Sequence, residues 1–262
     1  MDSGLLASLG PGMTRSYANA ALLLKDEALM HETRPIVLIP GLLCSARLYT
    51  HQIAALWQIA PVMVADHRRD ETIAAIAARI LADAPPRFAL AGLSMGGYIA
   101  GVVAQLAPER VQKLALLDTS ARPETPRQTE RRLEQISLAE SGRLAEVAEL
   151  LFPLFVHRNR HGDSALKQVV RLMAEETGPE AFVRQQRAIM ARPDLRPALA
   201  SIKCPTLVLV GDGDELTPPP LSEEIAAGIR GSRLIVVPEC GHLSTLEQPE
   251  AVNKLLVEWM ER

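Results

Sequence analysis

The chain has 262 residues, of which 48% are hydrophobic and 23% charged, and its formal net charge at pH 7 is −3. This length and composition are typical of a globular protein with a large core, in one large α/β domain or two small ones. The slightly acidic charge argues against binding to a phosphate backbone. Because only 3% of the residues are aromatic, no stacking platform for single-stranded nucleic acid is visible. We therefore expect no nucleic-acid partner.

The three cysteines, Cys44, Cys204 and Cys240, are widely separated and form neither a CxxC pair nor a Cys/His metal pattern. We therefore expect free thiols, no metal site and a cytoplasmic location. The first residues, MDSGLLASLGPGM, carry an acidic residue where a signal peptide is positively charged, and Gly and Pro interrupt their apolar stretch. No segment approaches the roughly 18 uninterrupted apolar residues of a membrane span, so we expect no membrane partner.

From residue 35 onward, short apolar runs alternate with helical patterns. The apolar runs predict strands over residues 35–40, 61–65, 88–93, 113–117, 206–210 and 234–237. The helical patterns predict helices near residues 46–58, 70–83, 95–107 and 249–260. Apolar strands that are each followed by a helix indicate an α/β fold with a mostly parallel sheet and helices on both faces. Ligands of such sheets bind at the carboxyl ends of the strands.

Residues 122–200 interrupt this alternation, because they contain charged amphipathic helical sequence and no strand signal. We expect this segment to form a helical cap over the ligand site. The predicted organisation is an N-terminal extension (1–34) without an assigned role, a core (35–121 and 201–262) and the cap (122–200). Five apolar residues of the cap either line a pocket or pack on the core: Leu150, Leu151, Phe152, Leu154 and Phe155.

The segment GLSMG, residues 92–96, places Ser94 between a predicted strand and a predicted helix rich in small residues. It matches G-x-S-x-G in the strand–turn–helix context in which this pattern presents a nucleophilic serine. The glycines let the tight turn bring backbone segments together. The amides and the positive dipole end of the helix favour an oxyanion at the same place. A glycine-rich packing turn is the alternative interpretation.

A serine hydroxyl is a poor nucleophile without a base, and the chain has six histidines. Only His242 stands just beyond a predicted strand end, where Gly241 lets the loop turn back over the sheet. The other five are expected in helices, in the extension or in the cap, as solvated or packed side chains: His31, His51, His67, His157 and His161. The imidazole in turn needs a carboxylate. Three candidates follow the strand predicted at 206–210: Asp212, Asp214 and Glu215.

With these residues the chain resembles the α/β-hydrolase superfamily, in its lid-bearing, esterase-like group, over roughly residues 35–260. The resemblance implies the α/β-hydrolase fold with a helical cap, a small-molecule substrate, and neither a metal nor an organic cofactor. In the family's G-x-x-D-x-x-x-P loop the acid is the aspartate three residues after the glycine, which is Asp214 here. The family's Ser…Asp…His order is met by Ser94, Asp214 and His242. Asp118, at the end of the strand predicted at 113–117, is the alternative acid, since some members place it there.

The same resemblance assigns the oxyanion hole to the backbone N–H groups of Met95 and Leu42. Many relatives carry His-Gly in the loop after the first strand, where this chain has PGLL at residues 40–43. The difference removes a histidine side chain that often braces this loop. Cys44 and Cys240 lie near this machinery, either as small packing residues or as a second nucleophile.

The sequence thus predicts a serine hydrolase that cleaves an ester or related acyl bond of a small, fairly apolar substrate through an acyl-enzyme. One alternative is carbon–carbon bond hydrolysis of a diketone-like ring-cleavage product, which relatives achieve with the same triad. Acyl transfer or cofactor-free perhydrolysis is another. The alternative that is not an enzyme is a protein with the same fold that binds a ligand without turning it over. A serine rather than an aspartate at the turn argues against cleavage of epoxides and carbon–halogen bonds. The natural substrate and the oligomeric state stay open.

Overall fold

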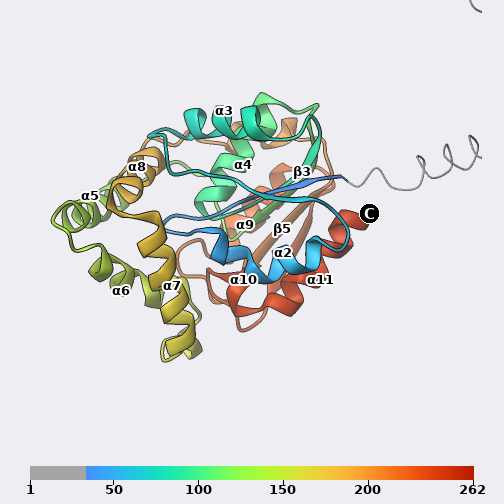
Figure 1. Ribbon diagram of the computed structural model, residues 1–262. Helices are drawn as coiled ribbons and strands as arrows, with labels where there is room; N and C mark the ends of the chain where they lie inside the picture. The colour runs from blue at the N-terminus through green and yellow to red at the C-terminus, as the bar shows by residue number, and fades with distance from the viewer. Residues whose placement is uncertain (1–33) are drawn as a thin grey trace, which may run out of the picture. The chain divides into compact units, whose positions relative to one another are not determined.

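The computed structural model describes residues 34–262, and residues 35–262 form one compact unit. The predicted N-terminal extension, apart from Arg34, lies outside the described residues. The apolar runs of the described part form one six-stranded sheet in the order β2-β1-β3-β4-β5-β6, with every neighbouring pair parallel (Figure 1). Its strands are β1 (Ile36–Ile39), β2 (Val62–Val64), β3 (Phe88–Leu93), β4 (Val111–Leu117), β5 (Thr206–Gly211) and β6 (Arg233–Val237). The predicted fold class is confirmed.

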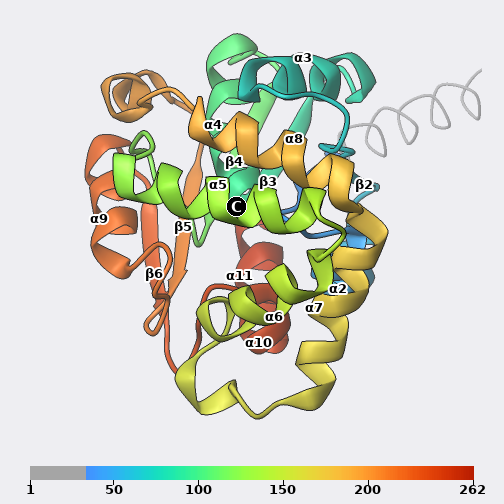
Figure 2. The same cartoon turned by 90° about the vertical axis from the view of Figure 1, so that its left-hand side faces the viewer.

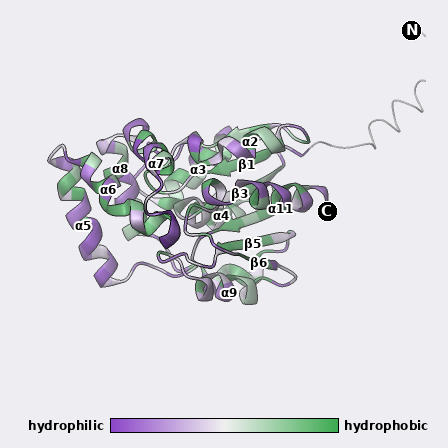
Figure 3. Ribbon diagram, turned by 90° about the horizontal axis from the view of Figure 1, so that it is seen from below, coloured by the Kyte–Doolittle hydropathy of each residue, from purple (hydrophilic) through white to green (hydrophobic). Residues whose placement is uncertain are grey.

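The burial of each strand follows from its place in the sheet. All residues of β3 are buried, because β3 lies between β1 and β4 and is covered on both faces. The edge strands β2 and β6 are mostly half-buried. Figure 3 shows the strands largely green, which marks the hydrophobic layer between the helices.

Helices cover both faces of the sheet, as the alternating pattern predicts. α3 packs against α4 on one face, and α2 packs against α11 on the other (Figure 1). The helix predicted near 46–58 is divided into a 3₁₀ turn at Ala46–Tyr49 and α2, and the sequence pattern did not reveal α9 or α10. The core helices are α2 (Thr50–Leu56), α3 (Ile73–Asp83), α4 (Met95–Leu106), α9 (Pro219–Gly228), α10 (Ser244–Glu247) and α11 (Pro249–Glu261). No helix within residues 34–262 combines the length and apolar character needed to cross a membrane.

Four helices, which we term the cap helices, follow β4 and precede β5: α5 (Pro126–Glu140), α6 (Leu144–Phe155), α7 (Ser164–Thr177) and α8 (Pro179–Met190). Figure 2 shows them together on the side that faces the viewer. Local sequence determines where they begin. Thr125 and Gln128 form a capping box at the start of α5, and Asp163 caps α7 by accepting from the Leu166 amide.

Two glycines allow the close approach of β1, β3 and α4 around Ser94. A Cβ atom on Gly96 would lie 2.0 Å from the Ile39 carbonyl oxygen, and one on Gly92 would lie 2.1 Å from the Gly96 carbonyl oxygen. The G-x-S-x-G spacing is therefore a packing requirement of this turn, independent of any chemistry.

We expect Gly96→Ala to lower the free energy of unfolding by about 3 kcal/mol, because its methyl group would collide with backbone that cannot rotate away. Gly162→Ala is the matched control, since a Cβ atom there meets nothing within 4 Å. Urea unfolding monitored by circular dichroism measures both variants. An unfolding midpoint for Gly96→Ala equal to that of the wild type would contradict the packing requirement.

Candidate active site

Ser94 lies at the turn between β3 and α4 in a backbone conformation that non-glycine residues rarely adopt, with φ 56° and ψ −116°. Four hydrogen bonds hold it there. The Ser94 amide donates to Leu117 O at 2.9 Å, and its carbonyl accepts from the Gly97 amide and the Thr119 hydroxyl, both at 2.8 Å, and from the Tyr98 amide at 3.3 Å. Neighbouring β4 and the first turn of α4 thus stabilise a strained residue at the carboxyl edge of the sheet.

The predicted base lies beside this serine. His242 Nε2 is 2.8 Å from Ser94 Oγ, and His242 Nδ1 is 2.8 Å from Asp214 Oδ2. Both His242 and Asp214 are buried. With Nδ1–H donating to the carboxylate, Nε2 is left to accept the serine proton. Residues 94, 214 and 242, predicted from three distant segments, are therefore joined in one chain of hydrogen bonds.

Asp214 is fixed by the turn that follows it. Its Oδ1 accepts from the Leu216 and Thr217 amides, both at 2.9 Å, and its Oδ2 accepts from the Thr217 hydroxyl at 2.7 Å. Burial alone would raise the pKa of this carboxyl, but the charge of His242 and these hydrogen bonds lower it. Burial likewise opposes protonation of the imidazole, and the charge of Asp214 outweighs it and raises the pKa of His242.

The other candidate acids have different partners. Asp118 is fully buried, accepts from the Gly211 amide at 3.0 Å and from the Ser244 hydroxyl, and makes no hydrogen bond to His242. Burial, with the nearby charge of Asp214, raises the pKa of Asp118 well above its usual range. Asp212 accepts from the Cys240 amide at 3.1 Å, and Glu215 lines the cavity described below.

The two predicted oxyanion donors flank Ser94. Met95 opens α4 directly after the serine, and Leu42 lines the cavity beside it. Gly41 brings this loop against the nucleophile, since a Cβ atom on Gly41 would lie 3.4 Å from Ser94 Cβ. Neither the Leu42 nor the Met95 amide donates to another residue in the described part of the chain. The oxyanion hole itself stays a prediction.

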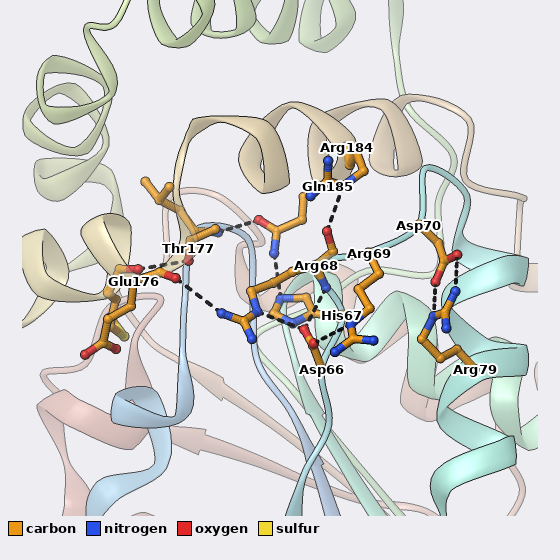
Figure 4. A network of polar contacts seen from close by, with 12 residues as sticks. Asp66, His67, Arg68, Arg69, Asp70, Arg79, Glu176, Thr177, Arg184 and Gln185 are labelled. Carbon is orange, nitrogen blue, oxygen red and sulfur yellow. Dashed lines mark hydrogen bonds and ion pairs between the residues drawn. The ribbon is translucent and has the colours of Figure 1, made fainter.

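A buried histidine from elsewhere in the sequence braces residues 40–43, which we term the oxyanion loop after its predicted role (Figure 4). His67 Nε2 lies 2.9 Å from Gly41 O and 3.0 Å from Gln185 Nε2, while Gln185 Oε1 accepts from the Leu43 amide at 3.1 Å. Leu43 needs this support, because its φ is 60°. Burial lowers the pKa of His67 to about 4, so the ring is neutral near pH 7.

His67 is a packed side chain, as one of the two expectations had it, but its predicted location in a helix, the extension or the cap is wrong. It lies in the loop after β2, because α3 begins only at Ile73, where the Thr72 hydroxyl caps the helix. A neighbouring network in this loop reaches the cap helices. Arg184 donates to Arg68 O at 2.8 Å, and Arg68 donates to Glu176 O at 3.3 Å (Figure 4).

Glu247, which no sequence pattern indicates, anchors the loop that carries His242. This buried carboxylate accepts from the Gly241 amide at 2.9 Å, the Leu243 amide at 3.3 Å and the His157 amide at 2.7 Å. Phe155 O at the end of α6 accepts from the His242 and Leu243 amides at 3.1 and 2.9 Å. Nothing in the local sequence separates Glu247 from an exposed helical glutamate, because its burial depends on the cap.

A cavity of about 490 Å³ opens onto Ser94 and His242. Of the five apolar cap residues, Leu151, Leu154 and Phe155 line it, while Phe152 is buried outside the lining and Leu150 is exposed. Cys44 also lines it, but burial raises the pKa of its thiol to about 12, and burial raises that of Cys240 as well. Neither cysteine is an activated nucleophile. No group of three or more potential metal ligands occurs within residues 34–262.

Residues 36–255 match the model of the alpha/beta hydrolase family. The chain belongs to this family. A hydrolase from Escherichia coli named 2-hydroxy-6-oxononadienedioate/2-hydroxy-6-oxononatrienedioate hydrolase is 30% identical over 181 residues. The aligned region spans 66% of this chain and only 62% of the length of that relative.

Solved structures of other hydrolases share the fold. A thermophilic esterase from Thermogutta terrifontis, solved with malate bound, has a TM-score of 0.78 at 28% identity, covering 87% of this chain and 89% of its own. An enol-lactonase from Burkholderia xenovorans has a TM-score of 0.80 at 26% identity, with coverages of 89% and 93%. Together with the E. coli relative, these similarities agree with membership of the alpha/beta hydrolase family and leave the substrate open.

We expect Asp214→Asn to slow phosphonylation of Ser94 by a fluorophosphonate by up to about 10⁴-fold, the effect of the same change in a serine protease. The acid limb of the rate profile should also move to lower pH. The charge of Asp214 raises the pKa of His242, so its loss lowers that pKa and the base stays neutral in more acidic solution.

Asp118→Asn is the matched control, because asparagine can still accept from the Gly211 amide and can donate to Ser244. It should slow the reaction less than about 10-fold, since no bond to the imidazole is lost. If Asp118→Asn slowed phosphonylation of Ser94 more than Asp214→Asn did, the acid would be Asp118.

We expect Gln185→Leu to lower the same rate about 10-fold, because the Leu43 amide loses its acceptor and the oxyanion loop loses its connection to α8. Gln168→Leu, an exposed change on α7, is the control and should leave the rate unchanged. A Gln185→Leu rate that equals that of the control would show that the brace does not position the oxyanion loop.

Proposed function

We propose that this chain is a serine hydrolase that cleaves an ester or related acyl bond through an acyl-enzyme. The proposal rests on the two contacts of His242, 2.8 Å to Ser94 Oγ and 2.8 Å to Asp214 Oδ2. These distances lie within the range over which a base activates a serine hydroxyl.

In the first half-reaction Ser94 Oγ attacks the carbonyl carbon while His242 Nε2 takes the hydroxyl proton. Asp214 stabilises the resulting imidazolium and keeps the ring in the tautomer with Nδ1–H. The Leu42 and Met95 amides hold the developing oxyanion, and one such donor typically contributes about 2.7–4 kcal/mol to transition-state stabilisation. His242 then returns the proton to the leaving alcohol.

In the second half-reaction His242 removes a proton from a water molecule that attacks the acyl-enzyme. The tetrahedral intermediate collapses, the acid leaves, and Ser94 recovers its proton from the imidazolium. Chemistry of this kind requires the base to be neutral at the start of each half-reaction. Activity should therefore fall as the pH drops through the raised pKa of His242.

The cavity supports a small substrate with an apolar acyl portion. Its volume of about 490 Å³ suits a small molecule, and Leu93, Leu154 and Phe155 are among its lining residues. Carbon–carbon bond hydrolysis of a diketone-like compound is the second candidate. It is favoured by the E. coli relative, whose name specifies an oxodienedioate as the substrate.

The test is labelling with a fluorophosphonate probe, followed by mapping of the adduct. We expect labelling at Ser94 in the wild type, none in Ser94→Ala, and labelling at least about 10³-fold slower in His242→Ala. A screen of p-nitrophenyl esters of increasing acyl length against a vinylogous diketone then separates the two hydrolytic candidates. A wild-type protein that is inert to both the probe and all substrates would support a ligand-binding role instead.

A further inference from the structure

The side of α5 that faces the cavity is polar, in contrast to the apolar residues near Ser94. Five lining residues come from the N-cap and the first turns of α5, and their spacing of three or four positions places them on one helical face. They are Thr125, Gln128, Arg131, Arg132 and Gln135. α5 is largely purple in Figure 3. A wall of this kind suits a charged or strongly polar part of a ligand.

The guanidinium groups around the cavity exceed the carboxylates that neutralise them. Four arginines line it, Arg122, Arg131, Arg132 and Arg192, and Glu215 is the lining carboxylate. Glu124 is shared between Arg132 and Arg192, and Glu224 pairs with Arg122. The guanidinium of Arg131 forms no ion pair or hydrogen bond within residues 34–262. The cap side of the cavity therefore carries uncompensated positive charge.

Only two of these arginines are placed to receive a ligand. Arg192 has a side chain that is only 4% exposed; it donates to Arg122 O and Ile189 O and lies over the Tyr98 ring, so it is a structural element of the wall. Arg132 is held through Nε by Glu124 and through Nη1 by Gln186, which leaves its Nη2 without a partner in the described chain. Arg131, its neighbour, is exposed.

We propose that Arg131 and Arg132 bind a carboxylate of the substrate, so that the hydrolase acts on acyl compounds carrying an anionic group away from the scissile bond. Arg132 supplies a guanidinium whose position is already fixed, and Arg131 supplies a second one that closes on the ligand. Guanidinium groups bind carboxylates through paired, charge-assisted hydrogen bonds. This inference rests on the proposed function, and it extends the predicted fairly apolar substrate to one with an apolar segment and a charged end.

The experiment compares charged and neutral substrates that are otherwise matched. Mono-p-nitrophenyl adipate and suberate carry the carboxylate on the acyl side, and their methyl esters are the neutral partners. 4-(Butyryloxy)benzoate and its methyl ester test a carboxylate on the leaving-group side. The readout is the ratio of kcat/KM for the charged substrate to that for its neutral partner, which cancels general effects on catalysis.

We expect the wild-type ratio to exceed that of Arg131→Gln by about 10-fold to 100-fold for at least one pair, and Arg131→Lys to retain part of it. Arg127→Gln, on the same helix but outside the cavity lining, makes the same charge change and should keep the wild-type ratio. Raising the salt concentration from 10 to 300 mM should lower the wild-type ratio, because a partly exposed ion pair is screened.

Equal ratios in the wild type, Arg131→Gln and Arg127→Gln would overturn the carboxylate site. In that case continued labelling of Ser94 and turnover of neutral esters would leave the proposed function intact. Loss of labelling and of all ester turnover in the wild type would instead overturn the proposed function. An equal decrease in Arg131→Gln and Arg127→Gln would assign the preference to the net charge of α5 and overturn the specific site.

Discussion

The strained backbone at Ser94 is the constraint on which the site depends. A residue with φ 56° persists only where its surroundings hold it, at a cost of about 1–3 kcal/mol. Here the support comes from the approach of α4 to β1 at Gly96 and from hydrogen bonds to β4 and α4. In residues 34–262 the other non-glycine residues with positive φ are Leu43, Asp118 and Glu239, and each also follows a strand at its carboxyl end. Strain is therefore concentrated along the edge at which the chemistry is proposed.

Two buried aspartates at this edge differ in environment. Asp214 accepts four hydrogen bonds including that from His242, so the pKa of its carboxyl is lowered and it remains charged. Asp118 accepts two, and burial raises the pKa of its carboxyl. The pKa values of the two carboxyls are thus shifted in opposite directions. Asp214 can stabilise an imidazolium, whereas Asp118 ties strands β4 and β5 to the segment after the histidine. Both aspartates follow a strand, so their hydrogen-bond partners, more than their position, indicate which of them acts as the acid of the triad.

The cap helices contact the core at both sides of the nucleophile. The end of α6 is bonded to the histidine loop through Phe155 and, by way of Glu247, through His157, while α8 reaches the oxyanion loop through Gln185. The same helices line the cavity, so the groups proposed to recognise the substrate and the groups that position the proposed catalytic loops belong to one packed unit. A change in the cap is therefore expected to alter specificity and rate together, because small displacements of reacting groups strongly affect rate.

The sequence by itself determined the alternation of strands and helices, the turn at Ser94 and the positions of Asp214 and His242, because apolar runs, glycine spacing and strand ends are local features. Only the tertiary structure places Asp214, the acid that the family resemblance implies, against the imidazole in preference to Asp118. It also shows that His67 and Gln185 brace the loop at residues 40–43 and that Glu247 is buried beneath the cap. It also revealed Arg131 at the cavity with no ion-pair partner among residues 34–262, although in sequence it resembles the other arginines of α5. These features require contacts between residues far apart in the chain, and no local periodicity encodes them.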